Sequence, residues 1–369
     1  MKILYDHQIF ANQIYGGISR YFYELMSAFS KNKTIDFDLS LTYSNNQYLE
    51  NAHFAAYHPF FRNINFRGKN RILNFINKQK SKKMLSEQDF DIFHPTYYNP
   101  YFLNSIGNKP FVLTIYDAIH EIYPKIFKIY DKTSQNKKLL ARKAAKIIAI
   151  SKNTKKDIIR LFNIDEKKIE VIYMGNSLGS NIQDKALNSI PNLPQTYVLF
   201  VGNRRGYKNF DLFIKAISGI LKEDSELCVV CAGGGRFTQS EINTLKELDI
   251  LRKVFQRPVT DEALARLYKG SIALIFPSLY EGFGIPVLEA FAYGCPVIVS
   301  NSSSFPEIAE EAAYYFDPNS ELSIYQAIKR IINDGELRKS LISKGYEQVK
   351  KFSWKKTTIQ TKSLYESIL

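Results

Sequence analysis

Short apolar runs alternate along this chain with longer amphipathic stretches, a pattern that predicts strands each followed by a helix. Because the runs are continuously apolar, we expect parallel strands covered by helices on both faces. The expected strands are residues 2–5, 37–41, 91–94, 111–115, 147–150, 170–172, 198–201, 227–232, 272–276 and 297–299, with helices between them, notably at 18–29 and 133–146. The pattern therefore predicts two α/β halves, each with a doubly wound parallel sheet.

A stretch rich in Asn, Ser, Gly and Pro interrupts this pattern between residues 176 and 194 and is typical of a linker. The chain has 369 residues, more than one hydrophobic core usually serves. We therefore expect a first domain at residues 1–178, a linker at 179–194 and a second domain at 195–354.

A glycine-rich turn follows the apolar run 272–276 and precedes a helix that has Pro286 in its first turn. Glycines there let a ligand approach the backbone, and the free amides at a helix N-terminus attract anions. This arrangement predicts a site for a phosphate group. The residues expected to form it are Gly282, Phe283, Gly284 and Ile285.

Two carboxylates flank this turn, Glu281 just outside the helix and Glu289 within its first turns. They offer acceptors to two hydroxylated parts of a phosphorylated ligand, which suggests a nucleotide sugar. The alternative is that both glutamates only complement the helix dipole.

A cationic loop follows the run 198–201, with Asn203, Arg204, Arg205 and Lys208 among its residues. Fixed cations stabilise the negative charge that develops on a departing diphosphate better in the transition state than in the ground state. In the first half, paired glycines at Gly16 and Gly17 precede a predicted helix and are candidates for contact with a phosphate.

Glu281 and Glu289, separated by seven residues, match the signature of the retaining glycosyltransferases of family 4, which this chain resembles. The likeness extends from Gly16 through the cationic loop to residues 300–307 and 352–354. It implies the GT-B architecture, in which two Rossmann-like domains face each other across a cleft. It also implies an acceptor-binding first domain, to which the last helix at 355–369 returns, and a second domain that binds the nucleotide sugar.

The resemblance further implies roles for individual residues. Lys208 aligns with the family's phosphate-binding lysine. The arginine that often follows the glycine is Asn203 here, so its role is expected to pass to Arg204, with Arg205 as the alternative. Glu281 is expected to orient the donor sugar and Glu289 to accept from the ribose. The remaining candidates are Asp117 and His120 beside the donor sugar, where Tyr116 replaces a common histidine, and Val259, whose backbone faces the base.

Transfer with retention at the anomeric carbon is also implied, with the leaving diphosphate helping to deprotonate the acceptor. No cofactor and no metal are expected, because cations and helix ends stabilise the leaving group. The expected donor is GDP-mannose or a related GDP-sugar, with a UDP-sugar as the alternative. The expected acceptor is a lipid-linked saccharide in bacterial surface polysaccharide synthesis.

The net charge of +14 is concentrated in a basic segment at residues 62–83, which has no acidic residue. Its cations are Arg62, Arg67, Lys69, Arg71, Lys78, Lys80, Lys82 and Lys83, interleaved with aromatic and aliphatic residues. This mixture predicts docking on anionic lipid headgroups of the inner leaflet. The alternative is a solvated basic face over an apolar stripe. No nucleic-acid-binding motif accompanies the charge, so we expect no nucleic-acid partner.

Two other classes of protein remain as alternatives. A dinucleotide-dependent oxidoreductase would need a Gly-x-Gly-x-x-Gly turn after the first strand, which this chain lacks. A non-catalytic membrane- or polyanion-binding module would need only the basic segment. No apolar run reaches the roughly 20 residues of a membrane span, and the chain opens directly into a predicted strand, so a cytoplasmic, peripheral location is expected.

Overall fold

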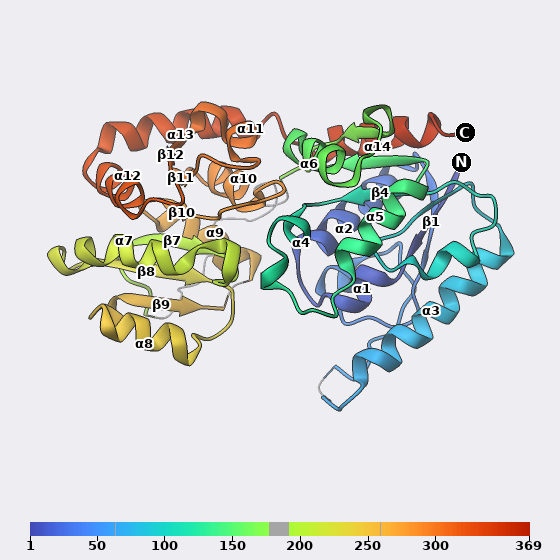
Figure 1. Ribbon diagram of the computed structural model, residues 1–369, viewed down its shortest axis with the longest axis horizontal. Helices are drawn as coiled ribbons and strands as arrows, with labels where there is room; N and C mark the ends of the chain where they lie inside the picture. Colours follow the sequence, from blue (N-terminus) through green and yellow to red (C-terminus); the bar gives the residue numbers. More distant parts are fainter. Residues whose placement is uncertain (63, 177–191, 259) are drawn as a thin grey trace. The chain divides into compact units, whose positions relative to one another are not determined.

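The computed structural model describes residues 1–62, 64–176, 192–258 and 260–369. The chain forms two compact units (Figure 1). Unit 1 comprises Met1–Gly175 and Ser353–Leu369, and unit 2 comprises Asn176–Phe352. Most of the predicted linker, residues 177–191, lies outside the described residues. Both units are α/β with parallel sheets, as the apolar runs predicted.

Unit 2 contains a six-stranded sheet in the order β12-β11-β10-β7-β8-β9, and every pair of neighbours is parallel. Its strands are β7 Thr196–Val201, β8 Leu227–Ala232, β9 Val254–Arg257, β10 Leu274–Phe276, β11 Val297–Ser300 and β12 Ala313–Phe316. Counted within the unit, this is the order 3-2-1-4-5-6 of dinucleotide-binding folds. From β7 the chain adds strands first on one side, through β8 and β9, and then on the other, from β10 onward. The point between β7 and β10 is therefore a switch point, where ligands bind beyond the carboxyl ends of the strands.

Amphipathic helices cover this sheet and form its core. In α7 the buried side chains recur three and four residues apart, at Phe210, Phe213, Ile214 and Ile217, so one face packs on the strands. The helices are α7 Phe210–Glu223, α8 Gln239–Glu247, α9 Asp261–Gly270, α10 Ile285–Ala292, α11 Phe305–Ala309, α12 Glu321–Asn333 and α13 Gly335–Val349.

Unit 1 has two three-stranded parallel sheets, β2-β1-β3 and β4-β5-β6, which a bridge between Phe93 and Phe111 joins. The strands are β1 Lys2–Asp6, β2 Asp36–Ser40, β3 Ile92–His94, β4 Val112–Ile115, β5 Lys146–Ala149 and β6 Ile169–Val171. The helices are α1 Gln8–Asn12, α2 Gly17–Asn32, α3 Lys69–Glu87, α4 Ile119–Ile122, α5 Thr133–Lys143 and α6 Lys152–Phe162. The helix predicted at 133–146 thus ends three residues early, because Lys146 already belongs to β5.

The last helix, α14 Trp354–Glu366, belongs to unit 1, where Figure 1 also shows both chain ends. Its Tyr365 hydroxyl lies 2.9 Å from the Tyr5 hydroxyl and 2.6 Å from Nδ1 of His94. All three side chains are fully buried, and burial lowers the pKa of His94 to about 3. Tyr365 therefore joins the helix to Tyr5 on β1 and to a neutral His94 on β3. Among the described residues, no helix is long and apolar enough to cross a membrane.

Candidate functional site

The loops after β7 and β10 meet at the switch point of unit 2. Lys208 ends a short 3-10 turn, Gly206–Lys208, and its Nζ lies 2.5 Å from Oε1 of Glu281. The two side chains are only 11% and 13% exposed. Lys208 Nζ also lies 4.9 Å from the centre of the Phe276 ring. Parallel pairing of β7 with β10 thus places two predicted site residues, 73 positions apart, in contact.

The glycine-rich turn after β10 has a backbone that only glycine adopts easily. Gly284 precedes α10 with φ of 100°, and a Cβ there would lie 3.2 Å from the ring of Phe305. Pro286 occupies the first turn of α10, as predicted.

Two serines from the loop after β11 fasten this turn. The amide of Glu281 donates to Oγ of Ser303 at 3.0 Å. Oγ of Ser304 approaches the carbonyl oxygens of Glu281 at 2.9 Å and of Phe283 at 3.0 Å. Sequence reasoning named the segment 300–307 but gave these serines no function. Their contribution depends on a contact between loops that no local pattern reveals.

Glu289 lies on α10 with its side chain buried, only 4% of the residue being exposed. One carboxylate oxygen accepts a hydrogen bond from the hydroxyl of Tyr268 on α9 at 2.9 Å. The tyrosine therefore fixes the orientation of this carboxylate. The predicted contact of Glu289 with a ribose stays a prediction.

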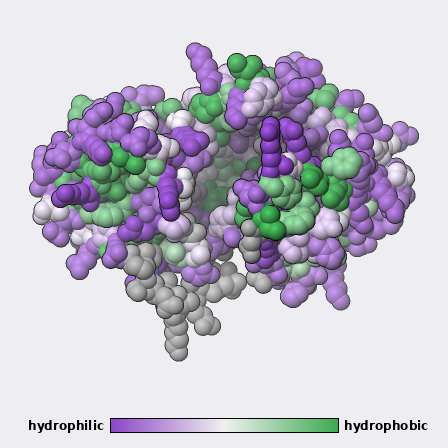
Figure 2. Space-filling view, turned by 90° about the horizontal axis from the view of Figure 1, so that it is seen from below, coloured by the Kyte–Doolittle hydropathy of each residue, from purple (hydrophilic) through white to green (hydrophobic). Residues whose placement is uncertain are grey.

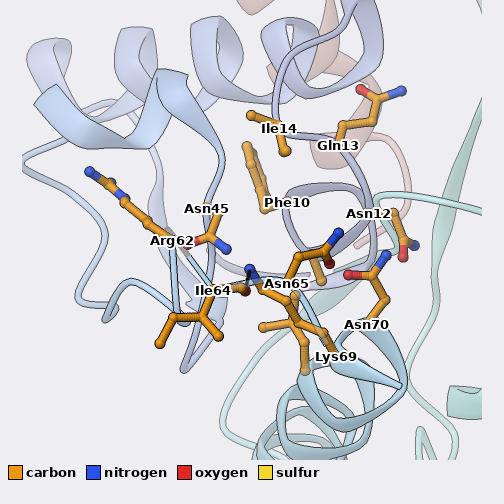
Figure 3. A pocket seen from close by; sticks show the side chains of 12 residues that line it. Phe10, Asn12, Gln13, Ile14, Asn45, Arg62, Ile64, Asn65, Lys69 and Asn70 are labelled. Carbon is orange, nitrogen blue, oxygen red and sulfur yellow. Dashed lines mark hydrogen bonds between the residues drawn. The ribbon is translucent and has the colours of Figure 1, made fainter. Parts of the chain in front are cut away.

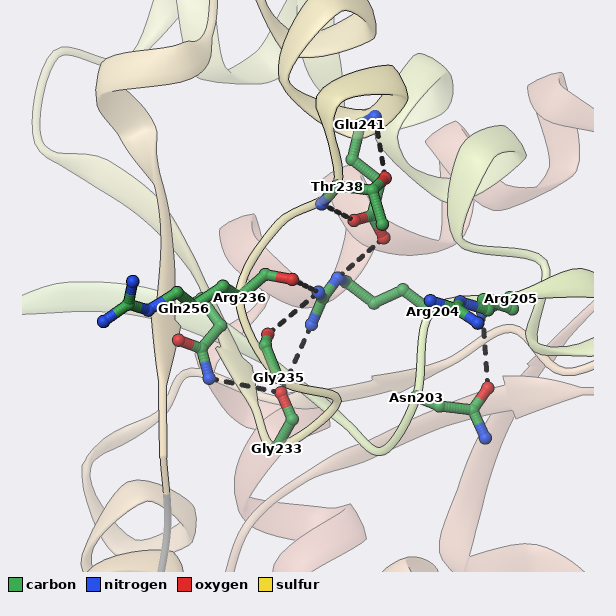
Figure 4. Close-up of polar contacts among 9 residues, drawn as sticks. All are labelled: Asn203, Arg204, Arg205, Gly233, Gly235, Arg236, Thr238, Glu241 and Gln256. Atoms are coloured by element: carbon green, nitrogen blue, oxygen red, sulfur yellow. Dashed lines mark hydrogen bonds and ion pairs between the residues drawn. The ribbon is translucent and has the colours of Figure 1, made fainter. Parts of the chain in front are cut away.

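Arg204 is buried within unit 2 and holds a neighbouring loop (Figure 4). Its Nε donates to Glu241 at 2.9 Å, and its Nη atoms donate to the carbonyl oxygens of Gly233, Gly235 and Arg236 at 3.0–3.2 Å. These bonds engage four of the five N–H groups of an arginine. Arg204 therefore supports the glycine loop after β8, and these contacts argue against the direct phosphate role predicted for it.

Arg205 and Asn203 differ from Arg204 because both are exposed. Oδ1 of Asn203 accepts a hydrogen bond from the amide of Arg205 at 3.3 Å. The predicted base contact of Val259 lies outside the described residues.

In unit 1, Gly16 and Gly17 lie at the N-terminal end of α2. A Cβ on Gly16 would come within 2.6 Å of Oε1 of Gln13, the atom that accepts the amide of Ser19 at 3.2 Å. A side chain at this position would have to displace the end of the Gln13 side chain, which caps the helix. One amide of this helix end is therefore already bonded, and the phosphate contact stays a prediction.

Asp117 follows β4 in unit 1 and accepts a hydrogen bond from the amide of Ile119 at 3.0 Å. The fully buried Lys137 places its Nζ 3.7 Å from the Asp117 carboxylate and 2.7 Å from that of Glu121. This lysine was not foreseen, since a single cation in an amphipathic helix carries no signal of burial.

His120 lies close to Asp117 along the chain, with its ring stacked on Phe127 at 3.7 Å between centres. Its Nε2 lies 3.6 Å from the carboxylate of Asp131. Burial lowers its pKa, and the nearby Lys137 cation lowers it further. Tyr116 stands where the family pattern has a histidine. Its side chain points into the core, edge-on to Tyr21, and therefore does not lie in a polar site.

Comparison with known families covers most of the chain. Residues 15–178 match the sequence model described as Glycosyltransferase Family 4, and residues 182–348 match the one described as Glycosyl transferases group 1. This chain is a family 4 glycosyltransferase. Its two α/β units with parallel sheets are those of the GT-B fold.

The curated relatives include several that are named as mannosyltransferases. This glycosyltransferase is 28% identical over 293 residues to the O-antigen chain mannosyltransferase B of Escherichia coli, covering 74% of each chain. It is 32% identical over 246 residues to the O-antigen chain mannosyltransferase RfbU of Salmonella typhimurium, covering 62% of this chain and 67% of the relative.

Solved structures share the fold over essentially the whole chain. Sucrose-phosphate synthase of Thermosynechococcus elongatus superposes with a TM-score of 0.77 at 19% identity, covering 100% of this chain and 98% of its own. Anabaena HepE, in complex with UDP and glucose, gives 0.76 at 15% identity and 99% coverage of both.

Proposed function

We propose that this glycosyltransferase moves a hexose from a nucleotide sugar to a lipid-linked saccharide with retention of anomeric configuration. The observation that carries the proposal is the Lys208–Glu281 pair beside the glycine turn, at the switch point of the unit 2 sheet. A cation, a helix N-terminus and a carboxylate meet there, which are the groups needed for a diphosphate and a sugar hydroxyl.

In this proposal the diphosphate lies against Lys208 and the amides of residues 282–285. Arg205 takes the second cationic role, because it is exposed whereas Arg204 is committed to the glycine loop. Glu281 exchanges its bond with Lys208 for the sugar hydroxyls, and Glu289 accepts from the ribose.

As the glycosidic bond breaks, negative charge grows on the diphosphate oxygen, and the cations stabilise it most strongly in the transition state. The acceptor oxygen then bonds to the anomeric carbon on the same face, and the departing oxygen takes the proton of the acceptor hydroxyl. Asp117 and His120 of unit 1 are proposed to lie beside the donor sugar.

GDP-mannose or a related GDP-sugar is the proposed donor. The support is that two relatives of this chain are named as O-antigen chain mannosyltransferases. A UDP-sugar is the second candidate, favoured by the fold shared with HepE, which was solved with UDP. Surface polysaccharide assembly is the proposed setting.

Nucleotide binding tests this function directly. We expect GDP, UDP or ADP, or one of their sugars, to raise the unfolding midpoint, since a ligand of the folded state stabilises it. Titration calorimetry of Lys208→Ala should show affinity for that nucleotide reduced about 100-fold. Lys215→Ala, an exposed lysine on α7 of the same unit, is the matched control and should bind normally. Absence of any nucleotide binding to folded protein would contradict the proposal.

We also propose that the enzyme docks on the inner leaflet through the α3 surface, defined as residues 61, 62 and 64–83. Five large apolar side chains are exposed there, Phe61 at 54%, Ile64 at 57%, Phe66 at 37%, Ile72 at 47% and Phe75 at 62%. Figure 2 shows such green apolar groups among purple hydrophilic ones on the face it presents. Of the cations, Arg62, Arg67, Arg71, Lys80 and Lys83 are exposed. Two of these have an ion pair, Arg62 with Glu50 at 3.0 Å and Lys83 with Glu87 at 3.9 Å.

Vesicle sedimentation checks the docking surface. We expect the protein to bind vesicles containing anionic lipid at low salt and to be released by salt, because headgroup attraction is screened. Ile72→Ser combined with Phe75→Ser should abolish binding. Ile359→Ser, which removes an equally exposed apolar side chain from α14, should not. Vesicle binding without nucleotide binding would instead support the non-catalytic module.

A further inference from the structure

A fully buried lysine holds the β4–α4 turn of unit 1, defined as residues 116–121. Lys137 lies on α5, where the buried positions are 137, 140 and 141, so it occupies the helix face that packs on the core. A lysine is almost never fully buried unless it is paired. The cavity of about 420 Å³ in Figure 3 is a different part of unit 1, lined by α1, the start of α3 and nearby loops.

The ammonium group of Lys137 contacts three segments of the chain. Its Nζ donates to the carboxylate of Glu121 on α4 at 2.7 Å and to the carbonyl oxygen of Asp117 at 3.1 Å, and it lies 3.7 Å from the Asp117 carboxylate. It also lies 5.6 Å from the centre of the Tyr98 ring, in the loop after β3. The hydroxyl of Tyr98 accepts the amide of Tyr116 at 3.2 Å. Both ends of the β4–α4 turn are therefore held by this one cluster.

Stability alone does not account for this arrangement. Removing two charges from water is costly, and replacing a buried ion pair by apolar side chains of similar size is often neutral or stabilising. The cluster also leaves polar atoms unsatisfied. Within the part of the chain that the structure describes, Oε1 of Glu121 and Nδ1 of His120 are buried without a hydrogen-bond partner. Native proteins tolerate such costs mainly at functional sites.

The turn that this lysine holds carries two residues of the proposed reaction, Asp117 and His120. The side chain of Asp117 is still 26% exposed, so a ligand can reach it. Its backbone and its carboxylate are both fixed by Lys137 from the buried side. The carboxylate therefore has its position before the donor arrives, which is the preorganisation that a reacting group needs.

We infer that Lys137 is a positioning residue for sugar transfer, which holds the β4–α4 turn, and with it Asp117, in the place where the donor sugar reacts. The inference rests on the proposed glycosyltransferase function and adds a residue that acts through another. Lys137 itself is fully buried, so it does not touch the substrate. Its loss should therefore slow the chemical step and leave nucleotide binding to unit 2 unaltered.

Four variants of the full chain separate positioning from simple charge balance. Lys137→Met alone leaves the Glu121 carboxylate buried without its cation and should destabilise the fold. Lys137→Met combined with Glu121→Gln removes both charges, so this double variant should fold. Glu121→Gln alone keeps the lysine and its bond to the Asp117 carbonyl oxygen. Lys138→Met, which changes the exposed lysine next along α5, is the matched control.

The first measurement is the release of GDP from GDP-mannose and of UDP from UDP-glucose, with water as the acceptor. The double variant should lose about 100-fold in kcat, the cost of a small misplacement of a reacting group, with little change in KM for the donor. Glu121→Gln should lose far less, and Lys138→Met should match the native protein. A folded double variant with the native kcat would overturn the inference, because Lys137 would then only balance a charge.

The second measurement is NMR of the histidine rings, which reports the position of the turn without any substrate. The His120 ring is stacked on Phe127 at 3.7 Å between centres, so the ring current of Phe127 should shift its protons upfield. His120→Gln identifies the signal by its loss. In the double variant the signal should move toward the values of an exposed histidine. An unchanged signal would show that the turn keeps its position without the lysine and would overturn the inference.

Nucleotide affinity of the same variants separates this inference from the proposed function. Native affinity in the double variant, together with a reduced kcat and a displaced His120 signal, supports the positioning role. Absence of nucleotide binding by the native protein would contradict the proposed function. A displaced His120 signal would in that case still show that Lys137 holds the turn.

Discussion

Arg204 and Arg205 are neighbours along the chain but lie in opposite environments. The first is 5% exposed and bonds to one carboxylate and three carbonyl oxygens, whereas the second is exposed beside the site. A buried guanidinium with this many partners is a fixed part of the loop, because leaving those partners unpaired is costly. Only the exposed arginine is available to a ligand.

Alanine substitutions distinguish the two arginines. Arg204→Ala leaves Glu241 without its cation, so the free energy of unfolding should fall by roughly 3 kcal/mol. Arg205→Ala should leave the unfolding midpoint unchanged and weaken nucleotide binding about tenfold. Denaturant titration and calorimetry measure both effects. A stable Arg204→Ala protein with a selective loss of nucleotide affinity would restore the role first predicted for Arg204.

The sequence indicated the chemistry of the unit 2 site but not its internal contacts. Glu281, Lys208 and the glycine turn carry local signals, namely residue types that suit a phosphate at a strand-to-helix junction. The hydrogen bonds of Ser303 and Ser304 to the glycine turn depend on loops from distant positions in the chain, and so does the burial of Arg204. Such contacts leave no trace in a local pattern, so the sequence favoured Arg204 over Arg205 for the phosphate role.

At the scale of elements, α14 is held to the sheet of unit 1 by a buried polar contact. Tyr365 on the helix bonds to His94 on β3, and Nε2 of His94 bonds to the hydroxyl of Thr114 on β4 at 2.9 Å. Because burial penalises the charged imidazolium, this contact exists with a neutral histidine. Docking of the last helix should therefore depend on pH.

The expected dependence follows from the pKa of His94, 6.5 in the unfolded chain and about 3 in the folded one. Between these values the unfolded state binds a proton that the native state excludes, so stability is full above pH 6.5 and falls below it. The contribution is at most about 1.4 kcal/mol per pH unit. Denaturation of unit 1 can be followed by the fluorescence of Trp354, the one tryptophan of the chain.

His94→Gln should reduce this slope, and His53→Gln, which changes an exposed histidine, should not. Equal slopes for the native protein and His94→Gln would show that protonation of this residue plays no part.

Most strands could be predicted because each is a continuous apolar run. β12, Ala313–Phe316, was missed because its sequence Ala-Tyr-Tyr-Phe is short and lies at the sheet edge, where two of its residues are only partly buried. The long helix α3 was recognised for its charge but not predicted as a helix. Its buried positions include the polar residues Asn77 and Ser81, which weaken the periodic signal.

At the scale of the whole molecule, unit 1 is discontinuous and unit 2 is a single segment. The chain leaves unit 1 after Gly175 and re-enters it at Ser353. At the re-entry, a Cβ on Gly175 would lie 2.3 Å from the amide nitrogen of Trp354. The segment that leaves unit 1 and the segment that returns to it are therefore tightly packed. Only a residue without a side chain fits that contact.

Truncation tests how far the two units depend on the last segment. A chain ending at Phe352 lacks α14 and exposes Tyr5 and His94, so hydrogen exchange in β1 and β3 should become fast. Nucleotide binding by unit 2 should persist. A chain ending at Glu366 keeps the helix and is the control. Unchanged protection of β1 and β3 in the shorter chain would contradict the structural role of α14.

The discontinuity of unit 1 also determines an order of events during synthesis. Domains generally fold as units as the chain emerges, the N-terminal one first. Here unit 1, although its first segment is synthesised earlier, cannot complete its fold first. The helix that covers β1 and β3 is translated only after all of unit 2. Unit 2 can therefore complete its fold first on the ribosome, while unit 1 still exposes the surface that α14 covers, which a chaperone can recognise.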